Sequence, residues 1–172
     1  MIESRRLRLH KMSEGDYAEV AAFLRDDEVM YAWEGGFSEE RVYEWLEQNI
    51  HRYERDGCGY LLARRKDTGE VAGAIGLIFN EDVGGRPCWE VAYILKKECW
   101  GKGYAREGAQ ACIDYAFGTL GVEKVACQIR VGNEPSVRVA EALGMRRICE
   151  YERVYHGIPM PHYIYTLEKS NV

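Results

Sequence analysis

The segment of this chain with the clearest chemical potential is the glycine-rich stretch Trp100-Gly101-Lys102-Gly103-Tyr104-Ala105. It lies between a predicted strand that ends near Leu95 and a long predicted helix. A glycine-rich backbone at a helix N-terminus exposes several N–H groups beside the positive end of the helix dipole, and together these bind phosphate. Glycine suits this position because a side chain would block the approach of a pyrophosphate. The pattern therefore predicts a phosphate-binding loop at residues 101–106.

This segment could be one of three kinds of phosphate-binding loop, or it could simply be a turn. A P-loop requires GxxxxGK[ST], which Gly-Lys-Gly-Tyr does not satisfy. A dinucleotide fingerprint requires a third glycine where this chain has Arg106, and it belongs after the first strand of a fold rather than after several antiparallel strands. The third kind is an acyl-CoA loop, and nothing in the segment contradicts it.

Polar residues near this loop supply candidate acid–base and capping groups. Glu90 stands in an otherwise apolar strand, either on a solvated face or as a partly buried carboxylate. In the second case it can take the proton that an amine nucleophile must lose, directly or through a water. Asn133 is a good N-cap for a short helix whose first turn contains Ser136.

The elements that must position these residues follow from hydrophobic periodicity. In chain order the pattern is β-α-α-β-β-β-α-β-α-β-β, with the long helix at residues 104–120, the short helix from Asn133 to Gly144 and a closing hairpin around residues 156–159. An antiparallel meander that enters a strand–helix–strand–helix unit predicts a mixed sheet with helices on both faces. The fold class is α/β, or α+β by a stricter convention. The length of 172 residues and the lack of a linker predict one domain over residues 1–172.

Composition excludes several classes of function. The chain has 23 Lys and Arg against 28 Asp and Glu, a net charge of −5, and no long basic run. We therefore expect no nucleic-acid partner. No apolar run approaches the ~20 residues that span a bilayer, so we expect no membrane partner. The six cysteines are scattered, the four histidines are dispersed and the first residues lack a secretory signal, so we expect a cytoplasmic protein without a metal site.

Three segments in the same order resemble the GNAT acetyltransferase superfamily, and within it the Rim-type ribosomal-protein N-acetyltransferases. They are the strand at residues 89–95, the loop at residues 99–107, and the segment from Asn133 to Met145. The superfamily loop is [QR]-x-x-G-x-[GA], and here Trp100 occupies its first position. The resemblance covers nearly the whole chain. It implies a mixed, mostly antiparallel central sheet of about seven strands with about four helices on both faces, and acetyl-CoA as co-substrate.

The resemblance also implies roles for individual residues. Glu90 is expected to be the catalytic base or amine ligand, and Ser136 lies near the CoA sulfur, where its hydroxyl can donate to the departing thiolate. Many relatives have a tyrosine general acid where this chain has Ala140, so Ser136, a water or unaided departure of a thiolate with a pKa near ~8.5 remain as alternatives. The residues expected to bind the cofactor are Ile94, Leu95, Trp100, Gly101, Lys102, Gly103, Tyr104, Ala105, Arg106, Asn133 and Ser136.

The acceptor side is less specific. Tyr31 and Trp33, in an aromatic loop with a glycine pair, either form a substrate wall or cover the core. Glu90 and Glu150 are the carboxylates expected to meet the acceptor. The expected activity is direct transfer of an acetyl group from acetyl-CoA to a primary amine of a small molecule or of a protein N-terminus. The alternatives are a catalytically silent CoA-binding sensor and a nucleotide- or NAD-binding protein. The acceptor stays open, as does the choice between monomer and homodimer.

Overall fold

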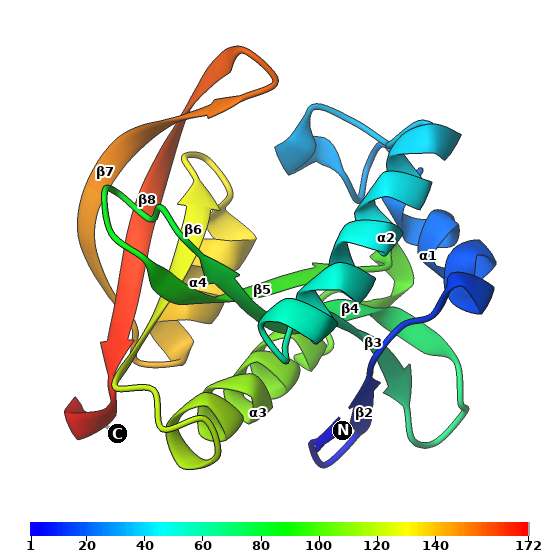
Figure 1. Ribbon diagram of the computed structural model, residues 1–172, viewed down its shortest axis with the longest axis horizontal. Coiled ribbons are helices and arrows are strands. Elements are labelled where there is room, and N and C mark those ends of the chain that lie inside the picture. The colour runs from blue at the N-terminus through cyan, green and yellow to red at the C-terminus, as the bar shows by residue number, and fades with distance from the viewer. Residues whose placement is uncertain (172) are drawn as a thin grey trace.

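One sheet organises the chain, as Figure 1 shows for the computed structural model, which describes residues 1–171. The sheet has eight strands. The strands are β1 (Ile2–Glu3), β2 (Leu7–His10), β3 (Tyr60–Arg65), β4 (Val71–Asn80), β5 (Cys88–Leu95), β6 (Lys124–Arg130), β7 (Arg146–Tyr155) and β8 (Ile158–Glu168). The helices are α1 (Tyr17–Leu24), α2 (Glu39–Arg55), α3 (Tyr104–Gly118) and α4 (Glu134–Ala142). The order of elements confirms the expected mixed α/β architecture.

The sheet is antiparallel except at one junction. Its strand order is β1-β2-β3-β4-β5-β6-β8-β7, and β5 and β6 are parallel neighbours because α3 forms the crossover between them. Only two residue pairs join β5 to β6, Trp89 with Val125 and Glu90 with Ala126. Beyond Glu90 the two strands are no longer paired with each other, so the sheet opens along the second half of β5.

Two features of the sheet go beyond the sequence-based expectation of about seven strands. The two-residue strand β1 pairs with β2 at the N-terminal edge. At the other edge, β8 lies between β6 and β7, so the closing hairpin joins the sheet through its second strand. The closing turn itself lies at residues 156–157, where both residues have positive φ, within the predicted segment.

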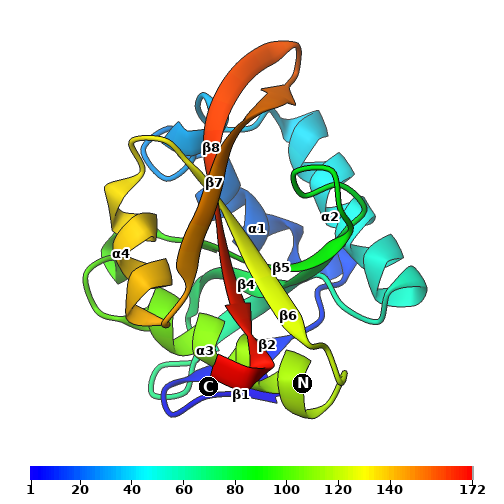
Figure 2. The same cartoon turned by 90° about the vertical axis from the view of Figure 1, so that its left-hand side faces the viewer.

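The helices cover the two faces of the sheet (Figures 1 and 2). Helices α1 and α2 contact each other, and α1 packs on β4. Helix α3 packs on β4 and β5 and contacts α4. Strand β4 is buried from Val71 to Ile78, as expected for a strand covered on both faces. At Gly108 of α3 the close approach of Ile75 leaves no room for a side chain. The packing thus fixes α3, and with it the glycine-rich loop, against the centre of the sheet.

Across residues 1–171, none of the helices combines the length and the apolar character needed to cross a bilayer.

Candidate active site

The glycine-rich loop adopts a conformation that exposes its backbone donors. Gly101 and Gly103 have φ values of 69° and 79°, a region that favours glycine, and Gly103 caps α3 without a side-chain hydrogen bond. The N–H groups of residues 101–106 make no hydrogen bond to another described residue. The first N–H groups of a helix lack intrahelical partners and carry the positive end of its dipole. The loop therefore presents main-chain donors that could bind an anion.

Trp100 holds this loop against the end of β5. Its indole Nε1 donates to the carbonyl oxygen of Leu95 at 2.9 Å, while the ring is partly exposed. A glutamine or arginine at the first position of the superfamily loop is thus replaced by a side chain that also carries an N–H donor. The departure leaves the main-chain donors of the loop in place.

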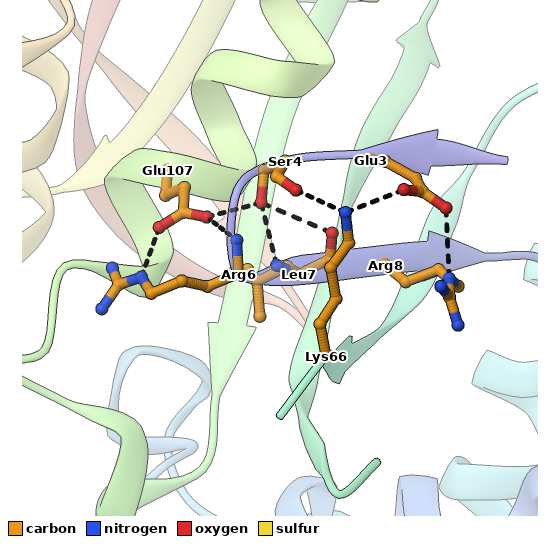
Figure 3. Close-up of polar contacts among 7 residues, drawn as sticks. All are labelled: Glu3, Ser4, Arg6, Leu7, Arg8, Lys66 and Glu107. Atoms are coloured by element: carbon orange, nitrogen blue, oxygen red, sulfur yellow. Dashed lines mark hydrogen bonds and ion pairs between the residues drawn. The ribbon is translucent and has the colours of Figure 1, made fainter. Parts of the chain in front are cut away.

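A network centred on Glu107 ties the first turns of α3 to the N-terminal hairpin (Figure 3). The Glu107 carboxylate accepts from Ser4 Oγ at 2.7 Å and from Arg6 N and Arg6 Nε at 2.6 Å each. Burial favours a raised pKa for Glu107, but the hydrogen bonds from Ser4 and Arg6 outweigh it and the pKa is lowered. The Arg6 guanidinium also lies 4.4 Å from the centre of the Tyr104 ring. The start of α3 is therefore fixed by residues about a hundred positions earlier in the chain.

A cavity of about 1130 Å³ extends from this loop across the opening between β5 and β6. It is lined by residues of α2, β5, the first turn of α4 and the β7–β8 hairpin. Most of the residues predicted from the sequence line it: Tyr31, Trp33, Glu90, Ile94, Leu95, Trp100, Gly101, Gly103, Tyr104, Ala105, Arg106, Asn133 and Ser136. One continuous space thus joins the predicted donor and acceptor residues.

Two predicted residues do not line this cavity. Lys102 is exposed at the tip of the glycine-rich loop, between two residues that do line it. Glu150 is exposed on β7, opposite Tyr163. Because successive side chains of a strand point to opposite faces, Glu150 points away from the face on which Arg153 and Tyr155 reach the cavity. Glu150, which was expected to meet the acceptor, therefore does not line this cavity.

Glu90 is a buried carboxylate held in a fixed orientation. Only 8% of the residue is exposed, and Oε2 accepts from Asn80 Nδ2 at 2.8 Å and from Gln128 Nε2 at 2.9 Å. The Tyr151 hydroxyl donates to Gln128 Oε1, which orients the amide so that its NH₂ group faces Glu90. A more distant donor, the backbone N–H of Gln128, lies 3.4 Å from Oε1. Oε1 therefore keeps capacity to accept a further proton donor.

Two further buried side chains line the cavity near Glu90. His162 Nδ1 lies 2.9 Å from the carbonyl oxygen of Met160, so Nδ1 carries the proton and Nε2 has a free lone pair in the neutral ring. Burial is the main cause of the lowered pKa of His162. Burial and the charge of Glu90 raise the pKa of the Tyr60 hydroxyl, while Arg52 and Arg153 act in the opposite direction. The site thus combines a carboxylate, a neutral imidazole and a protonated phenol.

The first turn of α4 binds two tyrosines from other elements. Asn133 Oδ1 accepts from Ser136 N at 3.4 Å, as expected for an N-cap, and from the Tyr31 hydroxyl at 2.6 Å. The Tyr93 hydroxyl of β5 donates to the Ser136 carbonyl oxygen at 3.3 Å. Burial raises the pKa of Tyr93, so its phenol stays protonated at neutral pH. Although α4 has Ala140 where relatives have a tyrosine, a tyrosine hydroxyl therefore lies beside Ser136.

Several residues of this site had no signal of their own in the sequence. They are Asn80, Gln128 and His162 around Glu90, Tyr93 beside Ser136, and the arginines Arg52 and Arg153. The alternation of strand residues could have assigned Tyr93 or His162 to a face, but not to a partner strand. Their convergence depends on the strand order, in which β8 lies next to β6.

This fold and this site define an acetyltransferase domain of the GNAT class. A family model described as "Acetyltransferase (GNAT) domain" matches residues 6–146, and the chain belongs to this family, whose members use acetyl-CoA as the acetyl donor. The resemblance inferred from the three sequence segments is thereby confirmed.

The chain is similar to proteins of several bacteria. The uncharacterized protein YkkB of Bacillus subtilis is 34% identical over 141 residues, which cover 81% of each chain. A putative ribosomal-protein-serine acetyltransferase from Vibrio cholerae shares the fold with a TM-score of 0.81, at 18% identity and with 97% and 96% of the two chains covered. Spermidine N-acetyltransferase from Vibrio cholerae, solved with CoA and spermine, has a TM-score of 0.76 at 20% identity, with 96% and 97% covered.

Proposed function

We propose that this protein transfers an acetyl group directly from acetyl-CoA to a primary amine, either of a small molecule or of a protein N-terminus. The observation that carries the proposal is the single cavity that joins the main-chain donors of residues 101–106 to the carboxylate of Glu90. Direct transfer requires donor and acceptor in one space, because their reacting atoms must approach within about 3–3.5 Å.

The residues around the glycine-rich loop fit a CoA pyrophosphate. The N–H groups of residues 101–106 are available, and a Cβ added at Gly101 would enter open space rather than protein. Arg106 and Arg138 line the same end of the cavity and add positive charge. Residues Ile94 and Leu95 pair with β4 but lie on the part of β5 that is not paired with β6. Apart from the Leu95 carbonyl oxygen, which accepts from Trp100, the backbone groups on this open edge are available to an extended pantetheine arm. The bound thioester supplies an activated acetyl group with a thiolate leaving group.

Glu90 is the proposed base. An amine reaches the site largely as ammonium at neutral pH, and it must lose a proton before it can attack. Glu90 Oε1 has capacity to accept that proton directly or through a water, while Asn80 and Gln128 hold the carboxylate in place. A backbone N–H of β5, in the segment that ends at Leu95, is the proposed donor to the acetyl oxygen as negative charge develops there.

The other end of the reaction needs a proton for the departing thiolate. Ser136 lines the cavity at the first turn of α4 and is the proposed donor, with Asn133 fixing that turn. Tyr31 and Trp33 are the proposed wall of the acceptor site. The Arg130 guanidinium donates to the carbonyl oxygens of Tyr31 and Ala32 at 3.3 Å each, which holds this wall near β6.

Release of the CoA thiol in the presence of a panel of primary amines and N-terminal peptides tests this proposal. We expect acceptor-dependent release that is lost in Glu90→Gln and reduced in Ser136→Ala. Thermal shifts with acetyl-CoA, CoA, ATP and NAD check the donor independently, because a ligand at ~100 times its Kd adds about 2.7 kcal/mol. Stabilisation by ATP or NAD, and none by either CoA form, would refute the donor assignment.

A catalytically silent CoA sensor is the second candidate, and the alanine at position 140 of α4, buried against the core, favours it. This candidate predicts stabilisation by CoA with no thiol release for any acceptor. We further propose that residues 1–172 act as one catalytic unit in the cytoplasm, as a monomer or homodimer, with no metal, nucleic-acid or membrane partner.

A further inference from the structure

Positive charge is concentrated in the cavity of a protein whose net charge is negative. Six arginines and three glutamates line the cavity, although the whole chain carries a net charge of −5. Part of this charge is compensated locally, because Arg130 forms an ion pair with Glu34 at 2.5 Å. Arg106, which ends the glycine-rich loop, and Arg138 of α4 are assigned to the CoA in the proposed function. The remaining arginines, which lie on α2 and β7, need a separate explanation.

The cavity-facing side of α2 presents one stripe of residues. Arg41, Trp45, Gln48 and Arg52 all line the cavity. Eleven residues make about three helical turns, so Arg41 and Arg52 point to nearly the same side of α2. Arg41 Nη2 donates to the Tyr155 hydroxyl at 2.6 Å, and its guanidinium lies 4.0 Å from the centre of the Phe37 ring. This bond joins α2 to the β7–β8 hairpin, which rises opposite α2 in Figure 1. The guanidinium of Arg41 therefore already has partners within the protein.

Among the described residues, the guanidinium groups of Arg52 and Arg153 have no such partners. Arg153 lies two residues before Tyr155 and therefore on the same face of β7. Neither guanidinium forms a hydrogen bond or an ion pair with any residue in the part of the chain that the structure describes, and the Tyr60 hydroxyl likewise makes no hydrogen bond there. Arg52 is half-buried, so part of its hydration is already lost. Three unpaired donors therefore line the same cavity.

The Tyr60 hydroxyl links these arginines to Glu90, because all three charges act on it. Tyr60 of β3 pairs with Gly76 of β4, and Glu90 of β5 pairs with Ile78 of β4. Because Gly76 and Ile78 are two residues apart, Tyr60 and Glu90 point to the same face of the sheet. The backbone N–H of Tyr60 also contacts α2, because it donates to Asn49 Oδ1 at 3.0 Å, and Asn49 lies about one turn before Arg52. The charges of Arg52 and Arg153 both lower the pKa of the Tyr60 hydroxyl, against the larger effect of burial, so both lie within electrostatic range of it.

We propose that the acceptor is a primary amine that also carries an anionic group, which Arg52, Arg153 and Tyr60 bind while the amine faces Glu90. The inference rests on the proposed acetyl transfer and adds the charge of the acceptor. A carboxylate accepts charge-assisted hydrogen bonds from guanidinium groups, which are about twice as strong as neutral ones. A polyamine would instead bring positive charge to two unpaired arginines. The anionic group is either the carboxylate of a free amino acid or an acidic side chain near the N-terminus of a peptide.

Matched acceptors separate these sources. Initial rates of CoA release are measured with peptide amides whose second residue is Asp, Asn or Lys, with a free amino acid and its amide, and with spermidine. We expect kcat/KM to be at least about tenfold higher for the Asp peptide than for the Asn peptide, or for the amino acid than for its amide, and lowest for spermidine. Equal or higher kcat/KM for neutral and cationic acceptors would overturn the inference and leave the acetyl transfer intact.

Variants assign the preference to the two arginines. Arg52→Gln and Arg153→Gln are each expected to raise KM for the anionic acceptor about tenfold or more, with kcat and the KM of neutral acceptors little changed. Arg55→Gln is the matched control, because Arg55 is on the same helix, pairs with Asp56 and does not line the cavity. If Arg52→Gln and Arg55→Gln behave alike, the arginine assignment is wrong.

A binding measurement covers the case in which no acceptor is turned over. The N-acetylated forms of the Asp and Asn peptide amides are titrated into the protein with CoA present. Tighter binding of the Asp form, lost in Arg52→Gln, supports the anion site even if acetyl transfer fails. Equal binding of the two forms, or no binding of either, refutes the anion site independently of turnover.

Discussion

The two ends of the cavity are built by different means. The donor end consists of main-chain N–H groups from a contiguous segment, residues 101–106, whose conformation depends on two glycines. The proposed acceptor end consists of side chains from α2, β3, β5, β7 and β8 and from the loop with Tyr31 and Trp33. A loop that binds through its backbone should tolerate a changed side chain, such as Trp100 at the first position of the superfamily loop. A site made of side chains changes its specificity with single substitutions, because each donor comes from a different element.

The largest effect is expected from a substitution of Glu90, where the proposed donor and acceptor ends meet. Glu90→Gln should lower kcat about 10²- to 10⁴-fold, because Gln cannot accept the proton of the ammonium, with little effect on the affinity for acetyl-CoA. Steady-state kinetics with both substrates varied measure this. Glu150→Gln is the control, since that exposed carboxylate does not line the cavity. Loss of activity in the control but not in Glu90→Gln would exchange their assigned roles.

The second prediction concerns the anchor of the donor end. Glu107→Gln should cost about 1–3 kcal/mol of the free energy of unfolding, because the charge-assisted bonds from Arg6 are weakened. Chemical denaturation measures the change, and Asp114→Asn, exposed on the same helix, should have little effect.

Glu107 should also make the stability of the protein depend on pH. The pKa of Glu107 is lowered in the folded protein, so its contribution to stability is present above the ordinary value of 4.5 and is lost as pH falls through the lower folded value. The wild-type protein should therefore lose stability more steeply below about pH 5 than Glu107→Gln does. Parallel curves for the two proteins would contradict an ionised, hydrogen-bonded Glu107.

A matched glycine pair tests whether the donor end binds through its backbone. Gly101→Ala and Gly69→Ala both place alanine at positive φ, 69° and 76°, with no atom near the new Cβ. Each should cost about 1–2 kcal/mol of stability. Only Gly101→Ala should weaken acetyl-CoA binding, about tenfold, because only that Cβ enters the cavity. Equal affinities in calorimetric titrations would show that the loop backbone does not meet the cofactor.

The smallest expected effect belongs to the acceptor end. Burial lowers the pKa of His162, so the unfolded chain binds a proton at this residue below about pH 6.5 while the folded protein does not. Stability should fall as pH drops from 7 to 5.5, and less so in His162→Gln. An unchanged slope in His162→Gln would mean that this histidine titrates normally.

Much of the fold could be predicted from the sequence because the elements have clear local signals. Ser38 caps α2 by accepting from Arg41 N, and Gly103 and Asn133 begin α3 and α4 where expected. The order of the strands in the sheet was beyond such signals, since alternation assigns faces but not neighbours. The position of β8 between β6 and β7 therefore came only from the structure.

The sequence by itself determined the family and the glycine-rich loop at the start of α3, because exposed main-chain N–H groups at a helix start require only local conformation, and two glycines specify it. It also identified Glu90, whose charge is conspicuous in an apolar strand. Only the tertiary structure decided which side chains meet that carboxylate and which do not. Asn80 and Gln128 bond to it, His162 lies within electrostatic range of it, and Glu150 does not line the cavity, because contacts among distant segments depend on register and strand order. The charge of the acceptor end arises in the same way, from Arg52 and Arg153, two residues a hundred positions apart.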